Sequence, residues 1–198
     1  MYNTTLITPP AAEPISTADA KAHCRVTIAT VEDTYIDALV KAARVHVEKT
    51  YGLALITQTW DMYLQNWPAG DSFHVRLPPL QSITSINYTD VDDTETEFSS
   101  TLYHVDIAKE PGRVKLAYGQ SWPTVVLKTL NPIVVRLVAG YGVAGANVPA
   151  DIILAMKFLI RHWYDNRTAV ETGVGIAAIE IPQTFHMLMD GYERRGLY

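Results

Sequence analysis

The spacing of apolar residues changes twice along the chain, and this limits the folds that the chain can adopt more than any other feature. Between residues 30 and 52 the apolar residues recur at the three- or four-residue interval of an amphipathic helix. They are Ile36, Leu39, Val40, Ala43 and Val47. From Thr57 the interval becomes two, the period of a strand with one buried face, and Gly52 is the expected end of the helix.

A helical interval returns near residue 150. Pro149 and Asp151 suit a first turn, and an apolar stripe follows at Ile152, Ala155, Met156, Leu159, Ile160 and Trp163. Helices therefore flank a β region on both sides. The sequence predicts an α+β fold, with a helical core from both chain ends and an inserted antiparallel β subdomain. The expected bounds are 1–15 for an extended N-terminal arm, 16–55 and 147–198 for the helical core, and 56–146 for the insertion.

The arm is predicted to be extended because its prolines remove amide donors and disfavour helix before them. Such arms often lie on a neighbouring chain. Ser16 or Thr17 can cap a short helix that ends near Arg25. In the β region, turn residues separate expected strands at 73–77, 83–88, 102–107 and 113–118 and a longer one within 124–139. This spacing suggests a meander or small barrel, with Pro132 at an edge or bulge.

The last residues, 164–198, combine a helix end, a Gly/Ala-rich segment and a short helix with a basic and aromatic tail. Pro182 can start that helix, whose apolar stripe is Phe185, Leu188, Met189 and Tyr192. The stripe either folds back on the chain's own core or inserts into a partner's groove. Trp163, Tyr164 and Arg167 form either an ordinary helix terminus or a protein interface, since aromatic and Arg side chains are enriched at interfaces.

The composition narrows the function. A net charge of −5 with 16 scattered Lys and Arg argues against a dedicated DNA-binding surface. The single Cys24 allows no internal disulfide, which favours an intracellular folding compartment. No secretory signal or membrane-spanning run is visible, so we expect a chain that is soluble and cytoplasmic when made.

The sequence contains no recognisable pattern of catalytic residues. The glycines near residue 140 lack the P-loop and dinucleotide patterns and suit a connector. The acidic run of residues 90–97 lacks the EF-hand glycine and suits an exposed hairpin tip. The six histidines show no i, i+4 pair for zinc. We therefore expect no catalytic residue, cofactor or metal; the rival is an enzyme or metal module that draws on His162, Asp165 and Glu171.

The order of several segments resembles the head–tail connector (adaptor) family of tailed phages, which also serves gene transfer agents. The segments are P-I-S-T-A-D-A-K-A-H-C-R-V from residue 14, Y-I-D-x-L-V-K-A-A-R from 35, L-P-P-L-Q-S-I-T-S-I-N-Y-x-D from 77, V-A-G-Y-G from 138, V-P-A-D-I from 148 and H-W-Y-D-N-R from 162. The resemblance implies a non-enzymatic protein that forms rings, typically twelve-fold, between the capsid portal and the tail. DNA would pass through the lumen without specific binding.

The resemblance also implies partners and contact residues. The partners would be the portal ring, further copies of the chain, and a stopper or tail-terminator protein. The portal contact would comprise Phe185, Leu188, Met189, Tyr192, Arg194, Arg195, Leu197 and Tyr198. Trp163, Tyr164 and Arg167 would lie between subunits. The protein would then reside in the virion neck after synthesis in the host cytoplasm. An alternative is a tail-completion or stopper protein of the same neck.

Overall fold

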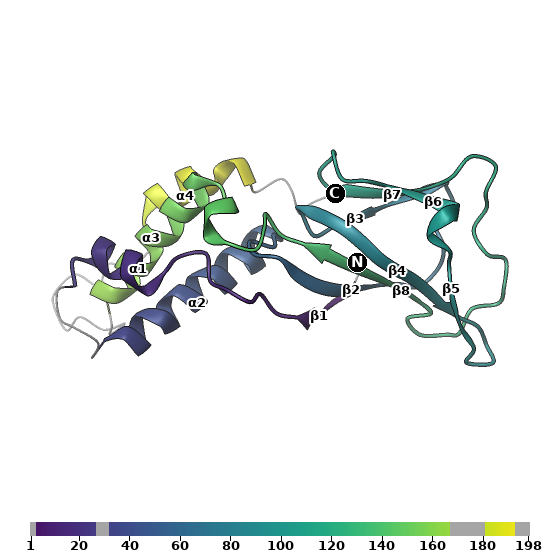
Figure 1. Ribbon diagram of the computed structural model, residues 1–198, viewed down its shortest axis with the longest axis horizontal. Coiled ribbons are helices and arrows are strands. Elements are labelled where there is room, and N and C mark those ends of the chain that lie inside the picture. The colour runs from purple at the N-terminus through teal and green to yellow at the C-terminus, as the bar shows by residue number, and fades with distance from the viewer. Residues whose placement is uncertain (1–2, 27–31, 167–180, 193–198) are drawn as a thin grey trace, which may run out of the picture.

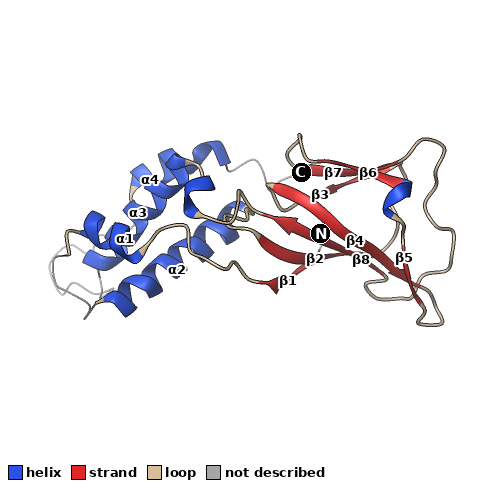
Figure 2. Ribbon diagram, viewed as in Figure 1, coloured by secondary structure: helices blue, strands red, loops and turns tan. Residues whose placement is uncertain are grey.

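The computed structural model describes residues 3–26, 32–166 and 181–192. The helices gather at one end of an elongated molecule and the strands at the other (Figure 1). Each end encloses a hydrophobic core of its own. The predicted α+β class is confirmed, since helices fill one end and strands the other (Figure 2). The colours of Figure 1 show that early and late segments of the sequence together build the helical end.

Four helices form the helical end: α1 (Thr17–Cys24), α2 (Asp33–Tyr51), α3 (Ala150–Asp165) and α4 (Gln183–Met189). The Ser16 hydroxyl caps α1 by accepting from the backbone N–H of Asp19 at 3.1 Å. Gly52 ends α2 in the left-handed conformation, with φ 63°. The predicted stripe of α3 lies in the core, apart from the half-buried Trp163.

Two sheets form the other end. A five-stranded sheet has the order β1 (Asn3–Thr8), β2 (Gln58–Leu64), β8 (Ile133–Ala139), β4 (Leu80–Thr89) and β5 (Glu95–Glu97). A three-stranded sheet has the order β3 (Ser72–Val75), β7 (Gly112–Leu116) and β6 (Tyr103–Asp106). All ladders are antiparallel, and apolar residues of both sheets share the second core. Short 3-10 turns occur at Ser100–Leu102, Gly145–Asn147 and Asp190–Tyr192.

The predicted meander is wrong, because β8 lies between β2 and β4. The central position suits β8, whose Ile133, Val135, Leu137 and Ala139 are fully buried. Asp61 of β2 faces Arg136 of β8 across the ladder and accepts both Nε and Nη2 at 2.8 Å. The last strand is also shorter than expected. Pro132 stands before β8, where a missing donor costs no ladder bond, and residues 117–132 form a long connection instead.

The two ends meet where the segment before β2 and the segment after β8 lie side by side. The Thr57 N–H donates to the Gly142 carbonyl at 2.9 Å, and the Tyr141 N–H donates to the Leu55 carbonyl at 3.1 Å. At Gly140, φ is +131° and a Cβ atom would lie 2.6 Å from the Ile56 carbonyl carbon. Only glycine allows this approach of two backbones. The glycine segment is thus the expected strand-to-helix connector.

A polar network reinforces the same junction. The buried Arg44 of α2 donates to Glu13 and to Glu48, each at 2.7 Å. Glu48 also accepts the Leu55 N–H at 3.0 Å and the Gln58 side chain at 2.7 Å. Burial opposes the charge of Arg44, yet the hydrogen bonds and charges of Glu13 and Glu48 outweigh it and raise the pKa of the guanidinium. The network ties the N-terminal segment, α2 and β2 together.

We predict that Arg44→Ala destabilises the fold by about 3 kcal/mol, because two carboxylates lose their buried cation. The measurement is chemical denaturation of the purified chain. Lys115→Ala is the matched control, since its ion pair with Asp71 is exposed, and it should change stability little. Equal stability of the two variants would contradict the role of the network.

Candidate assembly surfaces

The C-terminal stripe folds back on the chain's own core. Phe185 and Met189 are fully buried and Tyr192 is 8% exposed, while Leu188 packs partly buried against the same core. The Phe185 ring lies 6.3 Å from the Tyr51 ring and 5.9 Å from the His46 ring. Of the two interpretations from sequence, the structure therefore favours the first. While α4 stays in place, Phe185 and Met189 are not accessible to a portal, because both are fully buried.

A hydrogen-bonded contact holds the end of this segment. The Tyr192 hydroxyl lies 3.0 and 2.9 Å from the two carboxylate oxygens of Asp151, in the first turn of α3. The expected contact residues Arg194, Arg195, Leu197 and Tyr198 lie outside the described residues, as does Arg167. The structure therefore places only the apolar half of the predicted portal contact.

Both described residues of the expected subunit interface have partners within the chain. The Trp163 ring lies 5.9 Å from His46, and the Tyr164 ring lies 6.3 Å from Tyr35. The Tyr164 hydroxyl also donates to Glu32. Both side chains are half-buried. They complete the helical core first, and a contact with a second subunit stays a prediction.

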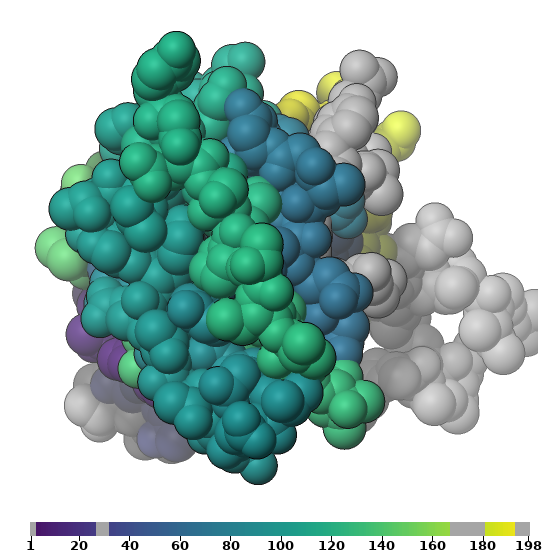
Figure 3. Space-filling view, turned by 90° about the vertical axis from the view of Figure 1, so that its right-hand side faces the viewer, coloured from purple at the N-terminus to yellow at the C-terminus, as the bar shows by residue number. Residues whose placement is uncertain are grey.

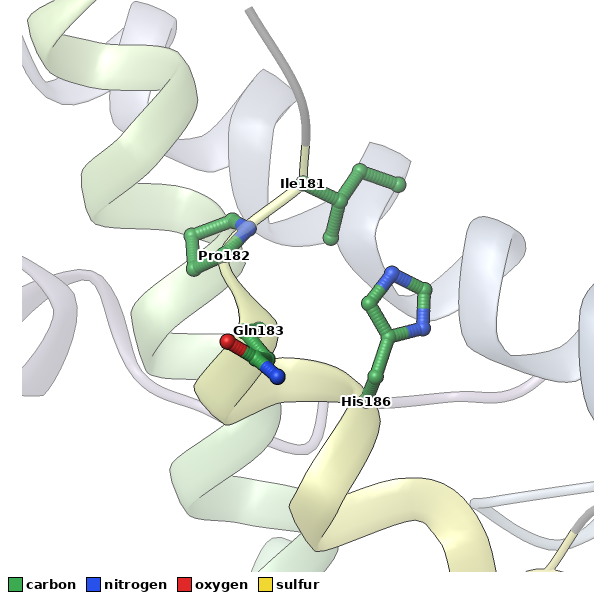
Figure 4. A pocket seen from close by; sticks show the side chains of 4 residues that line it. All are labelled: Ile181, Pro182, Gln183 and His186. Carbon is green, nitrogen blue, oxygen red and sulfur yellow. The ribbon is translucent and has the colours of Figure 1, made fainter.

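The described residues that line the hollow beside α4 are Ile181, Pro182, Gln183 and His186 (Figure 4). Among these four, the His186 imidazole has no carboxylate or thiol beside it. Among the described residues no three His, Cys, Asp or Glu side chains gather as a metal site would require. Of the rival set, His162 lies near Asn166, Asp165 pairs with Arg161 at 2.5 Å, and Glu171 is outside the described residues.

Several exposed apolar side chains lie on the connection of residues 117–132 and on the β4–β5 turn beside it. We call them the distal patch: Val91, Tyr118, Val125, Val126 and Leu130, each 45% exposed or more. Four of them belong to the connection 117–132, which lies across the β end in green and teal in Figure 3. The patch is not apparent from the sequence, because the valines of this connection resemble part of a strand. Its length was the available signal, since long loops in compact proteins often carry function.

Backbone hydrogen bonds and an aromatic cluster hold the connection of residues 117–132 in place. The Val91 N–H donates to the Val126 carbonyl at 3.2 Å, and the Lys128 N–H donates to the Thr89 carbonyl at 3.1 Å. The Trp122 ring stacks on Trp67 at 4.9 Å within an aromatic cluster. The other rings of the cluster are Phe73, Tyr88, Phe98 and Tyr103. The distal patch is thus apolar surface on a fixed backbone, beside the acidic turn that joins β4 to β5.

Fold and sequence together define the class of the chain. Residues 14–178 match the model of the head completion protein family. The chain belongs to that family, which confirms the predicted resemblance to head–tail connector proteins. A search of curated proteins gives no match.

Solved structures share the fold. A chain of the "Virion of native gene transfer agent (GTA) particle" matches with a TM-score of 0.76 and 19% identity, over 96% of this chain and 94% of that one. Chains of the "Neck of empty GTA particle computed with C6 symmetry" and the "Neck of native GTA particle computed with C12 symmetry" match at 21% identity, with TM-scores of 0.74 and 0.67. Each of these two matches covers 97% of this chain and 94% of the other.

We predict that Phe185→Ala destabilises the isolated chain by about 3–5 kcal/mol, because a fully buried ring is lost from the helical core. Met187→Ala is the matched control on the same helix. Met187 is 73% exposed, so its loss should cost less than about 0.5 kcal/mol. Denaturation curves of the purified variants measure both values, and an unchanged Phe185→Ala variant would show that α4 does not pack as described.

A second prediction concerns pH. Burial, and secondarily the charge of His186, lower the pKa of His46 below its ordinary value of 6.5. The unfolded chain then binds more protons than the fold below that value, so stability should fall as the pH drops from about 7 to 5. His46→Gln should reduce this slope, although His23, whose pKa is also lowered by burial, keeps part of it. Identical slopes of the denaturation midpoint against pH would contradict the prediction.

Proposed function

We propose that this chain is an adaptor subunit that forms a ring between the capsid portal and the tail. The main support for this proposal is that nearly the whole chain shares its fold with chains from the necks of gene transfer agent particles. In this proposal several copies form the ring, DNA passes through its lumen, and the mature protein lies in the virion neck after synthesis in the host cytoplasm. The chain acts as a structural protein and catalyses no reaction.

The two-ended shape supports this function. A neck subunit must contact one component on the head side and another on the tail side. The helical end offers the exposed face of α4, and the β end offers the distal patch. We assign the helical end to the portal and the distal patch to the next tail component. Because an exposed apolar patch on a fixed backbone loses little entropy on binding, it suits a permanent partner.

The charge of the chain suits a channel for DNA. Its net charge of −5 repels phosphate, so DNA is passed rather than held. None of the described helices is long and apolar enough to cross a bilayer. The proposed portal contact comprises Leu188, Arg194, Arg195, Leu197 and Tyr198. Phe185, Met189 and Tyr192 are instead buried in the chain's own core.

Two double variants test the two ends separately. Arg194→Glu with Arg195→Glu should abolish binding to the purified portal ring and leave the isolated fold unchanged. Val126→Asp with Leu130→Asp should leave portal binding unchanged and weaken capture of the tail-side component at least tenfold, a loss of about 1.4 kcal/mol. Val143→Asp is the matched control, since Val143 is 75% exposed but lies at the glycine connector.

Binding assays on portal particles and on portal loaded with candidate neck proteins give the readout. If the chain does not bind the bare portal and binds only a portal already loaded with another neck protein, it is a stopper and the adaptor proposal is wrong. If Val126→Asp with Leu130→Asp leaves binding of the tail-side component unchanged, the distal patch is not part of that interface.

A further inference from the structure

Strand β1 is attached to the molecule almost entirely through its backbone. All six of its residues are exposed, so none of its side chains belongs to either hydrophobic core. Within the part of the chain that the structure describes, its only strand partner is β2, in a register that runs from Asn3 opposite Tyr63 to Thr8 opposite Thr59. The position of β1 therefore depends on a ladder that any copy of β2 can supply.

The N-terminal segment is anchored again a few residues later. Glu13 accepts from Arg44 at 2.7 Å, and Ile15 is 3% exposed within the helical core. Residues 9–12, with the sequence Pro-Pro-Ala-Ala, join β1 to this anchor. The two prolines have no N–H to donate and favour extended backbone. This hinge spans up to about 17 Å between Thr8 and Glu13, enough to reach a subunit packed against that edge of the sheet.

We propose that in the assembled ring β1 leaves its own chain and pairs with β2 of the neighbouring copy. The proposal rests on the ring proposed above. Every backbone hydrogen bond of the ladder is remade on an identical partner, and the cross-strand pair of Leu6 with Trp60 is remade with it. Because no core side chain moves, the exchange costs little, as is general for swapped elements.

The two edges of the five-stranded sheet differ in how well they can pair with another chain. Strand β5 offers three exposed residues, Glu95, Thr96 and Glu97, and charged, short edges resist pairing. Strand β1 carries no charge, and Leu6 and Ile7 are 40% and 43% exposed. An uncharged edge strand with exposed apolar side chains can pair with a strand of another chain. The occupant is a second copy because the partner strand that fits this sequence in register is β2.

A disulfide across the ladder tests the exchange. Asn3→Cys and Tyr63→Cys in one chain place two thiols on facing Cα positions, at a separation that a disulfide spans. In the monomer the bond must close within one chain. In the ring, oxidation should link successive subunits, so that a non-reducing gel shows covalent multimers. Asn3→Cys alone is the control for contacts through the native Cys24, which is buried.

A mixing experiment makes the outcome unambiguous. Rings formed from equal amounts of the Asn3→Cys chain and the Tyr63→Cys chain should give crosslinked heterodimers after oxidation, whereas the same mixture of monomers should give none. If Tyr63→Cys fails to fold, Leu6→Cys with Trp60→Cys probes another facing pair of the same ladder.

The two proposals fail differently. If every double-cysteine chain in the ring forms its disulfide within itself, the strand exchange is wrong, but the ring proposal stands. The same result is expected if a neighbouring subunit only adds a strand outside β1. Failure of the wild-type chain to form rings on portal particles would overturn the ring itself.

Discussion

The buried guanidinium of Arg44 is the contact on which the rest of the structure depends. Two carboxylates, from the N-terminal segment and from α2, compensate its charge, and one of them also accepts from the start of the β region. Each of these groups would be costly to bury alone. Together they fix where the chain leaves the helical core, and so they set the position of β2 and of every strand that pairs with it.

The helices were predictable because their signals are local. The stripe of α3, the cap at Ser16 and the stop at Gly52 all act within a few residues of sequence. The order of the strands was not predictable, because β8 pairs with β2 and β4 through contacts that span dozens of residues. A period of two gives the buried face of a strand and leaves its neighbours undefined.

The assembly surfaces were harder to predict than the fold. An apolar stripe near a chain end is compatible with a core or with a partner, and only the neighbouring surface of α3 decides between them. Phe185 belongs to the core for that reason. The distal patch could not be predicted from the sequence, because Val125 and Val126 have a local preference for strand. Backbone contacts with the β4–β5 turn and the stacked Trp122 hold them in a loop instead.

The close approach at Gly140 has a consequence for geometry on a larger scale. A Cβ atom at Gly140 would collide with the backbone at Ile56, so a larger residue there would change how the helical end meets the β end. In a closed ring every copy repeats the same turn, and an error in one subunit is multiplied by the number of subunits. A glycine with no side chain would then help to determine the diameter of the channel.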